Sequence, residues 1–171
     1  TAVVQGAGGL GHIGVQTLKA ITSAKVIVVD RSPAALELAK EIGADETVVS
    51  DGSHIDAVKD LTGGRGADVV FDFVAEQGAE LDGWAMTAPA GYQYIIGYGG
   101  QFVAPTLDFV AGEKSVIGNI VGTYTDLAEL MVLAQAGKVT LHTQKYPLSE
   151  ALTALADLDA GNVRGRAILV P

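Results

Sequence analysis

A glycine-rich loop between an apolar strand and an apolar helix constrains this chain most. Residues Gly6-Ala7-Gly8-Gly9-Leu10-Gly11 match the pattern G-x-G-x-x-G. They follow a short apolar run at 2–5, which predicts a buried strand, and they open an apolar helical stripe over 10–21. A strand, a glycine turn and a helix in this order let the backbone approach an anion closely. The sequence therefore predicts a strand–helix unit with a phosphate-binding turn.

Each glycine of the motif has an expected role. Gly6 permits the tight turn, Gly8 leaves room for a pyrophosphate, and Gly11 lets the helix pack closely on the strand. The amides of Gly9 and Leu10 are then expected to point at phosphate oxygens, assisted by the partial positive charge of the helix start. The alternative is a glycine-rich turn without a ligand, and the strand–turn–helix context disfavours it.

A carboxylate follows the motif at the spacing that a dinucleotide site needs. Asp30 ends the second apolar run, 19 residues after Gly11 (30 − 11). A carboxylate there can accept hydrogen bonds from both ribose hydroxyls of an adenosine and repels a 2′-phosphate, which favours NAD over NADP. Arg31 can attract a 2′-phosphate, and we expect it to lie beside or over the adenine instead. The alternative for Asp30 is a solvated strand end.

Strand and helix periods alternate through most of the chain. Further strands are expected at 25–30, 46–49, 68–74, 92–97 and 114–120, and further helices at 33–43, 55–61, 76–87 and 126–136. Repeated strand–helix–strand units give a parallel sheet with right-handed crossovers. The expected fold is therefore α/β: a doubly wound, parallel six-stranded Rossmann sheet of order 3-2-1-4-5-6.

The end of the chain follows a different plan. From Val139 it reads as a strand, a helix at 149–158 and a strand at 164–170. We interpret this strand–helix–strand segment as a C-terminal appendage, with residues 1–138 as the Rossmann domain and 139–171 outside it. The uncharged stretch 83–107 contains glycines and prolines, so we interpret it as a strand with turns rather than a membrane span.

Composition excludes several classes of partner and site. The net charge of −9 disfavours nucleic acid and anionic membrane surfaces. The chain has no cysteine, which excludes disulfides and cysteine-based zinc sites and fits a cytoplasmic protein. His12, His54 and His142 stand alone, so no metal site is expected. His12 is expected to make a polar contact at its helix start, and His54 to be exposed. No catalytic grouping is evident.

Several motifs in order resemble those of the medium-chain zinc-type alcohol dehydrogenases, most of all the bacterial and archaeal secondary-alcohol type. They cover essentially the whole chain and are residues 3–14 (VVQGAGGLGHIG), 28–30 (VVD), 39–45 (AKEIGAD), 70–74 (VFDFV), 95–100 (IIGYGG) and 163–171 (VRGRAILVP).

The resemblance implies roles for further residues. The pyrophosphate would lie on Gly9 and Leu10, the ribose on Asp30, and Arg164 would reach the pyrophosphate. The nicotinamide half would be lined by Val74, Ile96, Gly97, Tyr98, Asn119, Ile120 and Val121. Subunits would pair through 114–120, with 102–110 beside it, into a homodimer or homotetramer.

The resemblance also implies that part of the machinery lies outside this chain. The family's zinc ligands, proton relay and most of its pocket for a small alcohol or ketone precede the cofactor domain, so we expect a fragment that is inactive alone, with 139–171 rejoining the catalytic domain. Two other hypotheses stay open: a non-enzymatic NAD-sensing module, and a zinc-free quinone reductase of the same superfamily. Asp30 argues against the second, because those relatives usually prefer NADPH. A methyltransferase is disfavoured by its different glycine pattern.

Overall fold

The computed structural model describes residues 1–171 and has the predicted sheet. Six parallel strands lie in the order β3-β2-β1-β4-β5-β6, which confirms the expected doubly wound topology. The strands are β1 (Ala2–Gln5), β2 (Val26–Asp30), β3 (Glu46–Val49), β4 (Ala67–Asp72), β5 (Thr87–Ile95) and β6 (Ser115–Gly118). Strand order therefore reverses next to β1, which places the glycine loop at the topological switch point.

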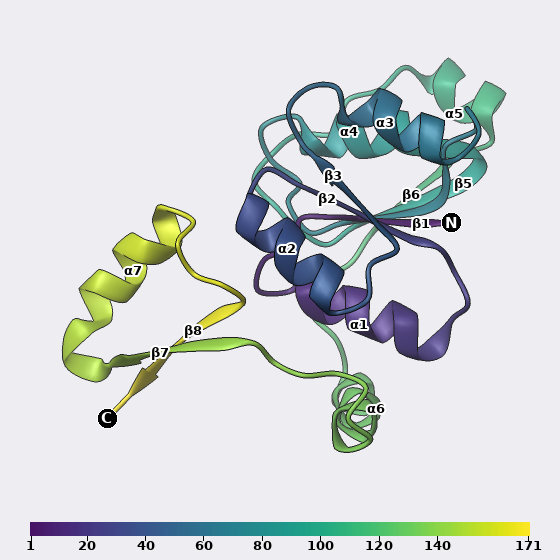
Figure 1. The fold of residues 1–171 in the computed structure, drawn as a ribbon. Helices are drawn as coiled ribbons and strands as arrows, with labels where there is room; N and C mark the ends of the chain where they lie inside the picture. Colours follow the sequence, from purple (N-terminus) through teal and green to yellow (C-terminus); the bar gives the residue numbers. More distant parts are fainter.

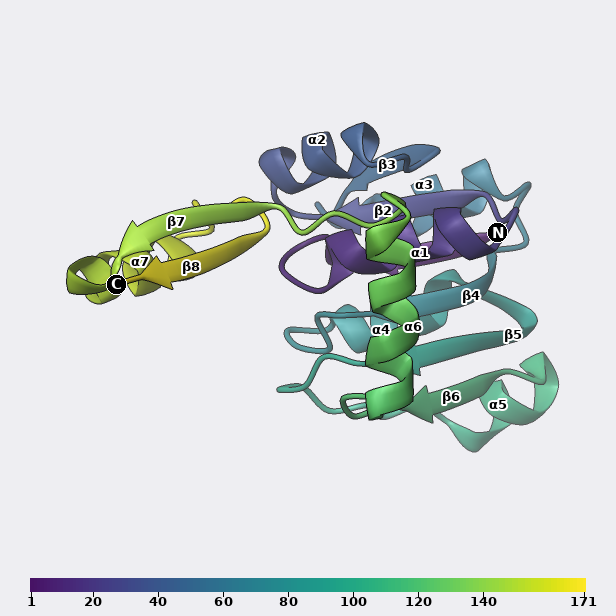
Figure 2. The ribbon, with the colours of Figure 1, turned by 90° about the horizontal axis from the view of Figure 1, so that it is seen from below.

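Helices cover both faces of this sheet (Figure 1). The helices are α1 (Gly11–Ile21), α2 (Pro33–Glu41), α3 (His54–Leu61), α4 (Ala79–Met86), α5 (Thr106–Gly112) and α6 (Tyr124–Gln135). Figure 1 shows α1 and α2 on one face and α3 and α4 on the other. Figure 2 shows α6 crossing several strands on the face that carries α1. The sheet is thus the middle of three layers.

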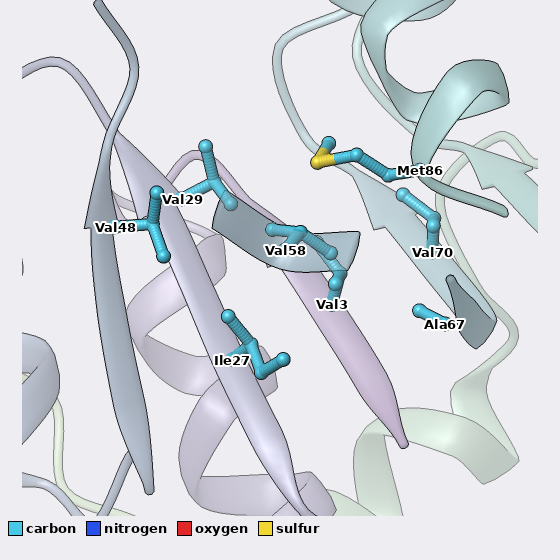
Figure 3. Close-up of a cluster of buried hydrophobic side chains, with 8 residues drawn as sticks. All are labelled: Val3, Ile27, Val29, Val48, Val58, Ala67, Val70 and Met86. Carbon is cyan, nitrogen blue, oxygen red and sulfur yellow. The ribbon is translucent and has the colours of Figure 1, made fainter. Parts of the chain in front are cut away.

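The alternation of side chains along β1 divides the core into two parts. Val3 packs in a cluster beneath α3 and α4, with Ile27, Val70 and Met86 among its members (Figure 3). Val4 points to the opposite face and joins the cluster beneath α1 and α2. Successive residues of a strand face opposite sides, and a strand buried on both sides reads as a continuous apolar run. This explains why the opening strand consists of apolar residues up to Gln5.

The C-terminal segment forms a small unit of its own. Strands β7 (Thr143–Pro147) and β8 (Arg166–Val170) pair in parallel, and between them lie a 3₁₀ turn at Leu148–Glu150 and helix α7 (Ala151–Asp159). Figures 1 and 2 show this unit projecting from the end of the sheet where the glycine loop lies. The predicted strand–helix–strand appendage is therefore present.

Two elements differ from the sequence-based expectation. Strand β5 begins at Thr87, immediately after α4, so the predicted start at residue 92 is too late. Helix α5 lies where no helix was predicted. It is 7 residues long, starts after Pro105 and has no side-chain cap, so it lacks the usual start signals. No helix combines the length and apolar character needed to cross a bilayer.

The first helix packs on the first strand through a backbone contact. A Cβ atom placed on Gly11 would lie 1.8 Å from the carbonyl oxygen of Gly6. No side chain can rotate to relieve this overlap, because the opposing atom belongs to the backbone. Only glycine at residue 11 therefore lets α1 start where it does, and the predicted close packing of Gly11 is observed.

We expect Gly11→Ala to destabilise the chain by about 3 kcal/mol or more, since the methyl group forces α1 away from β1. Gly118→Ala is the matched control: no atom lies within 4 Å of the position that a Cβ on this residue would take, so its effect is expected within about 0.5 kcal/mol. Urea unfolding followed by circular dichroism measures both. Equal stability of the two variants would contradict this explanation of the helix start.

Candidate functional site: a cleft at the carboxyl edge of the sheet

A cleft with a volume of about 680 Å³ lies where the strands end. The residues that line it come from the ends of β1 and β2, from the loops after β1, β2, β3, β4 and β5, from α4 and from β8. They are Gln5, Gly6, Gly8, Gly9, Leu10, Gly11, Val29, Asp30, Arg31, Ser50, Phe73, Val74, Glu76, Gln77, Ala79, Asp82, Ile96, Gly97, Tyr98 and Arg166. The cleft thus occupies the position where doubly wound folds bind their ligands.

The glycine loop offers this cleft a row of backbone donors. No side chain caps the start of α1, and the amides of Gly9 and Leu10 have no acceptor within the protein. Nothing lies within 4 Å of the position that a Cβ on Gly8 would take. A helix start with free amides and open space in front of it fits an anionic group.

Asp30 holds the loop in place from the next strand. Its Oδ2 accepts a hydrogen bond of 2.7 Å from the amide of Ala7, and its Oδ1 accepts one of 2.7 Å from the amide of Ser32. The carboxylate therefore joins the glycine loop to the start of α2. Ser32 also caps α2, because its hydroxyl accepts from the Ala35 amide at 3.4 Å.

An arginine from the C-terminal unit reaches the glycine loop. A Cβ on Gly9 would lie 2.6 Å from Cδ of Arg166 and 2.7 Å from its guanidinium Nη1, so the side chain passes directly over this glycine. Arg166 lines the cleft and forms no ion pair with a protein carboxylate. Arg164, the arginine singled out by the resemblance, lies outside the cleft and pairs with Glu41 of α2.

The residues expected around a nicotinamide divide into two groups. Val74, Ile96, Gly97 and Tyr98 line the cleft. Asn119, Ile120 and Val121 follow β6 and do not line it; Ile120 is 89% exposed and Val121 is 95% exposed. The loops after β4 and β5 therefore wall the cleft, and the segment after β6 does not.

The histidines have structural contacts. Nδ1 of the buried His12 lies 2.9 Å from the carbonyl oxygen of Gly8, which confirms the expected polar contact at the helix start. The prediction that His54 is exposed is wrong: its side chain is buried, and Nε2 lies 3.1 Å from the Asp82 carboxylate of α4. Residues 52–54 give no sign of this contact, because the partner comes from a distant helix.

Sequence reasoning missed several residues of the cleft. Ser50 follows β3, and the rule that ligands lie at carboxyl ends of strands could have indicated it. Glu76 and Gln77 lie in the loop after β4, where the left-handed backbone of Gln77 (φ 56°) gives no sequence signal. Asp82 enters from inside α4, and only the packed structure shows that it faces the cleft.

A buried polar layer supports the wall of the cleft. Gln5, Asp72 and Gln93 lie on one face of the sheet, as the pairing of their strands shows, and Glu80 of α4 is buried too. Each has one oxygen without a hydrogen-bond partner in the protein. The other oxygen of Asp72, Oδ1, accepts from the amides of Val74 and Ala75. Asp72 thereby shapes the loop that carries Val74.

Burial raises the pKa of the Asp72 carboxyl, and the charges of Glu80 and Asp82 act in the same direction against its two amide hydrogen bonds. A group whose folded-state pKa is raised makes the chain less stable as pH rises through that pKa. The ionised form is therefore costly at neutral pH.

No group of three or more His, Asp or Glu side chains is arranged to hold a metal ion, and the chain has no cysteine. The cleft's donors and acceptors instead suit an elongated ligand: free amides and a guanidinium around the glycine loop, and a carboxylate at the end of β2. Fold and cleft together define a Rossmann-type nucleotide-binding domain.

The sequence matches the zinc-binding dehydrogenase family over residues 9–136, so the chain belongs to that family. It is 34% identical to an NAD-dependent alcohol dehydrogenase of Sulfurisphaera tokodaii, over the whole of this chain and 50% of that protein. It is 30% identical to the D-arabinose 1-dehydrogenase (NADP(+)) of Saccharolobus solfataricus, covering 99% of this chain and 49% of that one.

Solved structures agree with this assignment. The crystal structure of the alcohol dehydrogenase from Aeropyrum pernix is 40% identical and superposes with a TM-score of 0.96, over 99% of this chain and 50% of that chain. The chain therefore spans about half the length of the relatives that it matches. It corresponds to the NAD-binding part of these dehydrogenases.

We expect Asp72→Asn to stabilise the chain at pH 7 by about 1 kcal/mol, because it removes a buried charge while the amide oxygen can still accept from the amides of Val74 and Ala75. The advantage should shrink as the pH falls through the acid range, where the wild-type carboxyl takes up a proton. Urea unfolding at several pH values measures this. Asp60→Asn, at an exposed site on α3, is the control, and a neutral-pH loss of stability specific to Asp72→Asn would contradict the cost assigned to this charge.

Proposed function

We propose that this chain binds NAD in the cleft and is the cofactor-binding part of an NAD-dependent zinc alcohol dehydrogenase. The intact enzyme would transfer hydride between NAD and a small alcohol or ketone, with a secondary alcohol as the expected substrate class. The relatives named above support the reaction class. The chain alone is expected to bind the cofactor without catalysing the reaction.

One observation carries the proposal: three groups suited to the parts of a dinucleotide line one cleft. They are the glycine loop with its free amides, the carboxylate of Asp30 and the guanidinium of Arg166. The amides of Gly9 and Leu10 would hold the diphosphate, and Arg166 would neutralise it. We assign this contact to Arg166 rather than Arg164, because Arg164 is paired with Glu41 outside the cleft.

Asp30 would select the unphosphorylated ribose. Its oxygens already accept from Ala7 and Ser32, which orients the carboxylate, and a carboxylate oxygen can accept further hydrogen bonds. A 2′-phosphate placed beside it would meet like charge. Arg31 also lines the cleft, and we expect it beside the adenine.

The chemistry of the intact enzyme divides between two parts. Bound NAD supplies the hydride acceptor, and this chain's residues bind and orient it. Val74, Ile96, Gly97 and Tyr98 would hold the nicotinamide end, and we propose that Asn119, Ile120 and Val121 complete it beside the second half of the enzyme. The chain offers no ligand set for zinc, so we assign any zinc to residues outside it.

The same fold is compatible with two other functions, and cofactor preference and upstream sequence distinguish them. A zinc-free quinone reductase would favour NADPH, whereas Asp30 favours NADH. An NAD-sensing module would bind NADH without zinc-ligand residues upstream. We retain the dehydrogenase because the relative from Sulfurisphaera tokodaii is an NAD-dependent alcohol dehydrogenase.

We also propose that the intact protein is a homodimer or homotetramer. Strand β6 is an edge of the sheet, and beside it Val103, Leu107 and Val110 expose between 69% and 75% of their surface. An edge strand flanked by exposed apolar side chains suits pairing with a second copy.

We expect the wild-type chain to bind NADH more tightly than NADPH. Asp30→Asn should weaken NADH binding about tenfold and reduce the preference, because hydrogen bonds to a charged acceptor are lost. Titration of NADH and NADPH fluorescence measures both, with Glu37→Gln, an exposed site on α2, as the control. Equal or reversed preference in the wild type would refute the role of Asp30.

We expect Gly8→Val to weaken NADH binding by about tenfold or more while leaving the unfolding midpoint nearly unchanged. The added side chain points into open space in the cleft and meets no protein atom at its Cβ, so its effect falls on the ligand. Gly118→Val, whose site is equally open but outside the cleft, is the control. Unchanged affinity in Gly8→Val would place the diphosphate elsewhere.

A further inference from the structure

The C-terminal unit lies apart from the six-stranded sheet (Figures 1 and 2) yet supplies Arg166 to the cleft. The position of this guanidinium therefore depends on how the unit is attached. Two side chains of the first helix, Gln16 and His12, make the attachment, and both are buried. We call these two residues and their contacts with 140–142 the polar clamp.

Gln16 joins α1 to the segment before β7. Its Nε2 donates to the carbonyl of Thr140 at 3.0 Å, and its Oε1 accepts from the Thr140 amide at 2.8 Å. Nε2 also donates to the carbonyl of His12 at 3.0 Å. One side chain thus satisfies both backbone groups of Thr140, 124 residues away in sequence. This contact fixes both the place and the direction of the chain there.

His12 makes the second contact and touches the glycine loop as well. Nδ1 must donate to the Gly8 carbonyl 2.9 Å away, since a carbonyl only accepts. In the neutral ring, Nε2 is then an acceptor, and it receives the amide of His142 at 3.4 Å. Burial lowers the pKa of His12, which favours this neutral form. The ring therefore bridges the loop and the C-terminal segment.

The path continues from His142 to Arg166. The amide of Arg166 donates to the His142 carbonyl at 3.0 Å. Gly165 allows this approach: its φ is +80°, and a Cβ there would lie 2.3 Å from the same carbonyl oxygen. From this anchored backbone the Arg166 side chain passes over Gly9. The contacts form a closed circuit from the glycine loop through His12, the C-terminal segment and Arg166 back to the loop.

A second polar link, an ion pair, joins the C-terminal unit to the Rossmann domain and contributes less to the attachment than the polar clamp. Arg164 and Glu41 form an ion pair whose side chains are 46% and 52% exposed. Solvent and salt screen such a pair, and ordering two long side chains offsets much of its attraction. The hydrogen bonds of the polar clamp are part-buried, with buried partners on α1, so solvent and salt screen them less. The polar clamp is therefore the attachment that can hold Arg166 in one place.

We propose that His12 and Gln16 are positioning residues for the diphosphate site: they touch no cofactor, and they set its affinity by fixing the backbone from which Arg166 reaches the glycine loop. This inference rests on the proposed function, because Arg166 is taken as the diphosphate ligand. It adds that two residues of the first helix that do not line the cleft set how much the C-terminal unit contributes to cofactor affinity.

A double-mutant cycle on the 171-residue chain tests the inference. Gln16→Met keeps the approximate size of the side chain and removes its hydrogen bonds. It should weaken NADH binding roughly threefold to tenfold in the wild-type background and have no further effect in the Arg166→Ala background. Gln135→Met, at an exposed position of α6, is the matched control and should leave binding unchanged. An equal loss in both backgrounds, or no loss in either, would overturn the proposal.

His12→Asn provides a second variant. The shorter amide can still donate to the Gly8 carbonyl from the Nδ1 position but cannot reach the His142 amide, so it should show the same dependence on Arg166. Glu41→Gln removes the exposed ion pair and should change affinity much less than either variant. A larger effect of Glu41→Gln would mean that the ion pair, not the polar clamp, holds Arg166.

Hydrogen exchange without cofactor separates this inference from the proposed function. The amides of Thr140 and Arg166 should exchange slowly in the wild type and faster in Gln16→Met, while the amides of β1 stay protected. If the wild type shows no NADH binding, the proposed function fails, and with it the affinity role of the polar clamp. Faster exchange would then support only the structural link, and unchanged exchange would refute that link too.

Discussion

The contact between Gly11 and the carbonyl of Gly6 determines where the site can form. Because residue 11 has no side chain, α1 starts directly against the end of β1, and a Cβ there would overlap the Gly6 oxygen. The helix start then faces the edge of the sheet where the strand order reverses. Moving the helix outward by the width of a methyl group would also move the amides of Gly9 and Leu10 away from the cleft. Fold and candidate site therefore depend on the same glycine.

The loop between these two glycines is held from both sides before any ligand binds. The Ala7 amide donates to Asp30 on β2, and the Gly8 carbonyl accepts from His12 on α1. These contacts use one backbone donor and one backbone acceptor of the loop. The amides of Gly9 and Leu10 are left without an acceptor within the protein. Donors that are oriented in advance bind an anion with less loss of conformational entropy than a mobile loop. The same logic extends to Arg166, whose backbone is anchored through His142.

The sheet could be predicted because each of its determinants is local in sequence. Apolar runs of strand length alternate with helical stripes, and the glycine motif follows the first run directly. Asp30 could be placed for the same reason, as the last residue of β2. Contacts between distant segments could not be predicted in this way. Arg164 and Arg166 look equivalent in V-R-G-R, but the left-handed turn at Gly165 sends only Arg166 over the loop. His54 is buried because α4 brings Asp82 to it, and no nearby residue signals that contact.

The central claim is that the glycine loop, Asp30 and Arg166 together hold a dinucleotide. A crystal structure of the chain soaked with NAD tests this most directly. We expect the diphosphate within hydrogen-bond distance of the Gly9 and Leu10 amides and of the Arg166 guanidinium, with the adenosine ribose on Asp30. A diphosphate bound away from the loop, or a loop unoccupied at saturating NAD, would contradict this claim and leave only the fold explained.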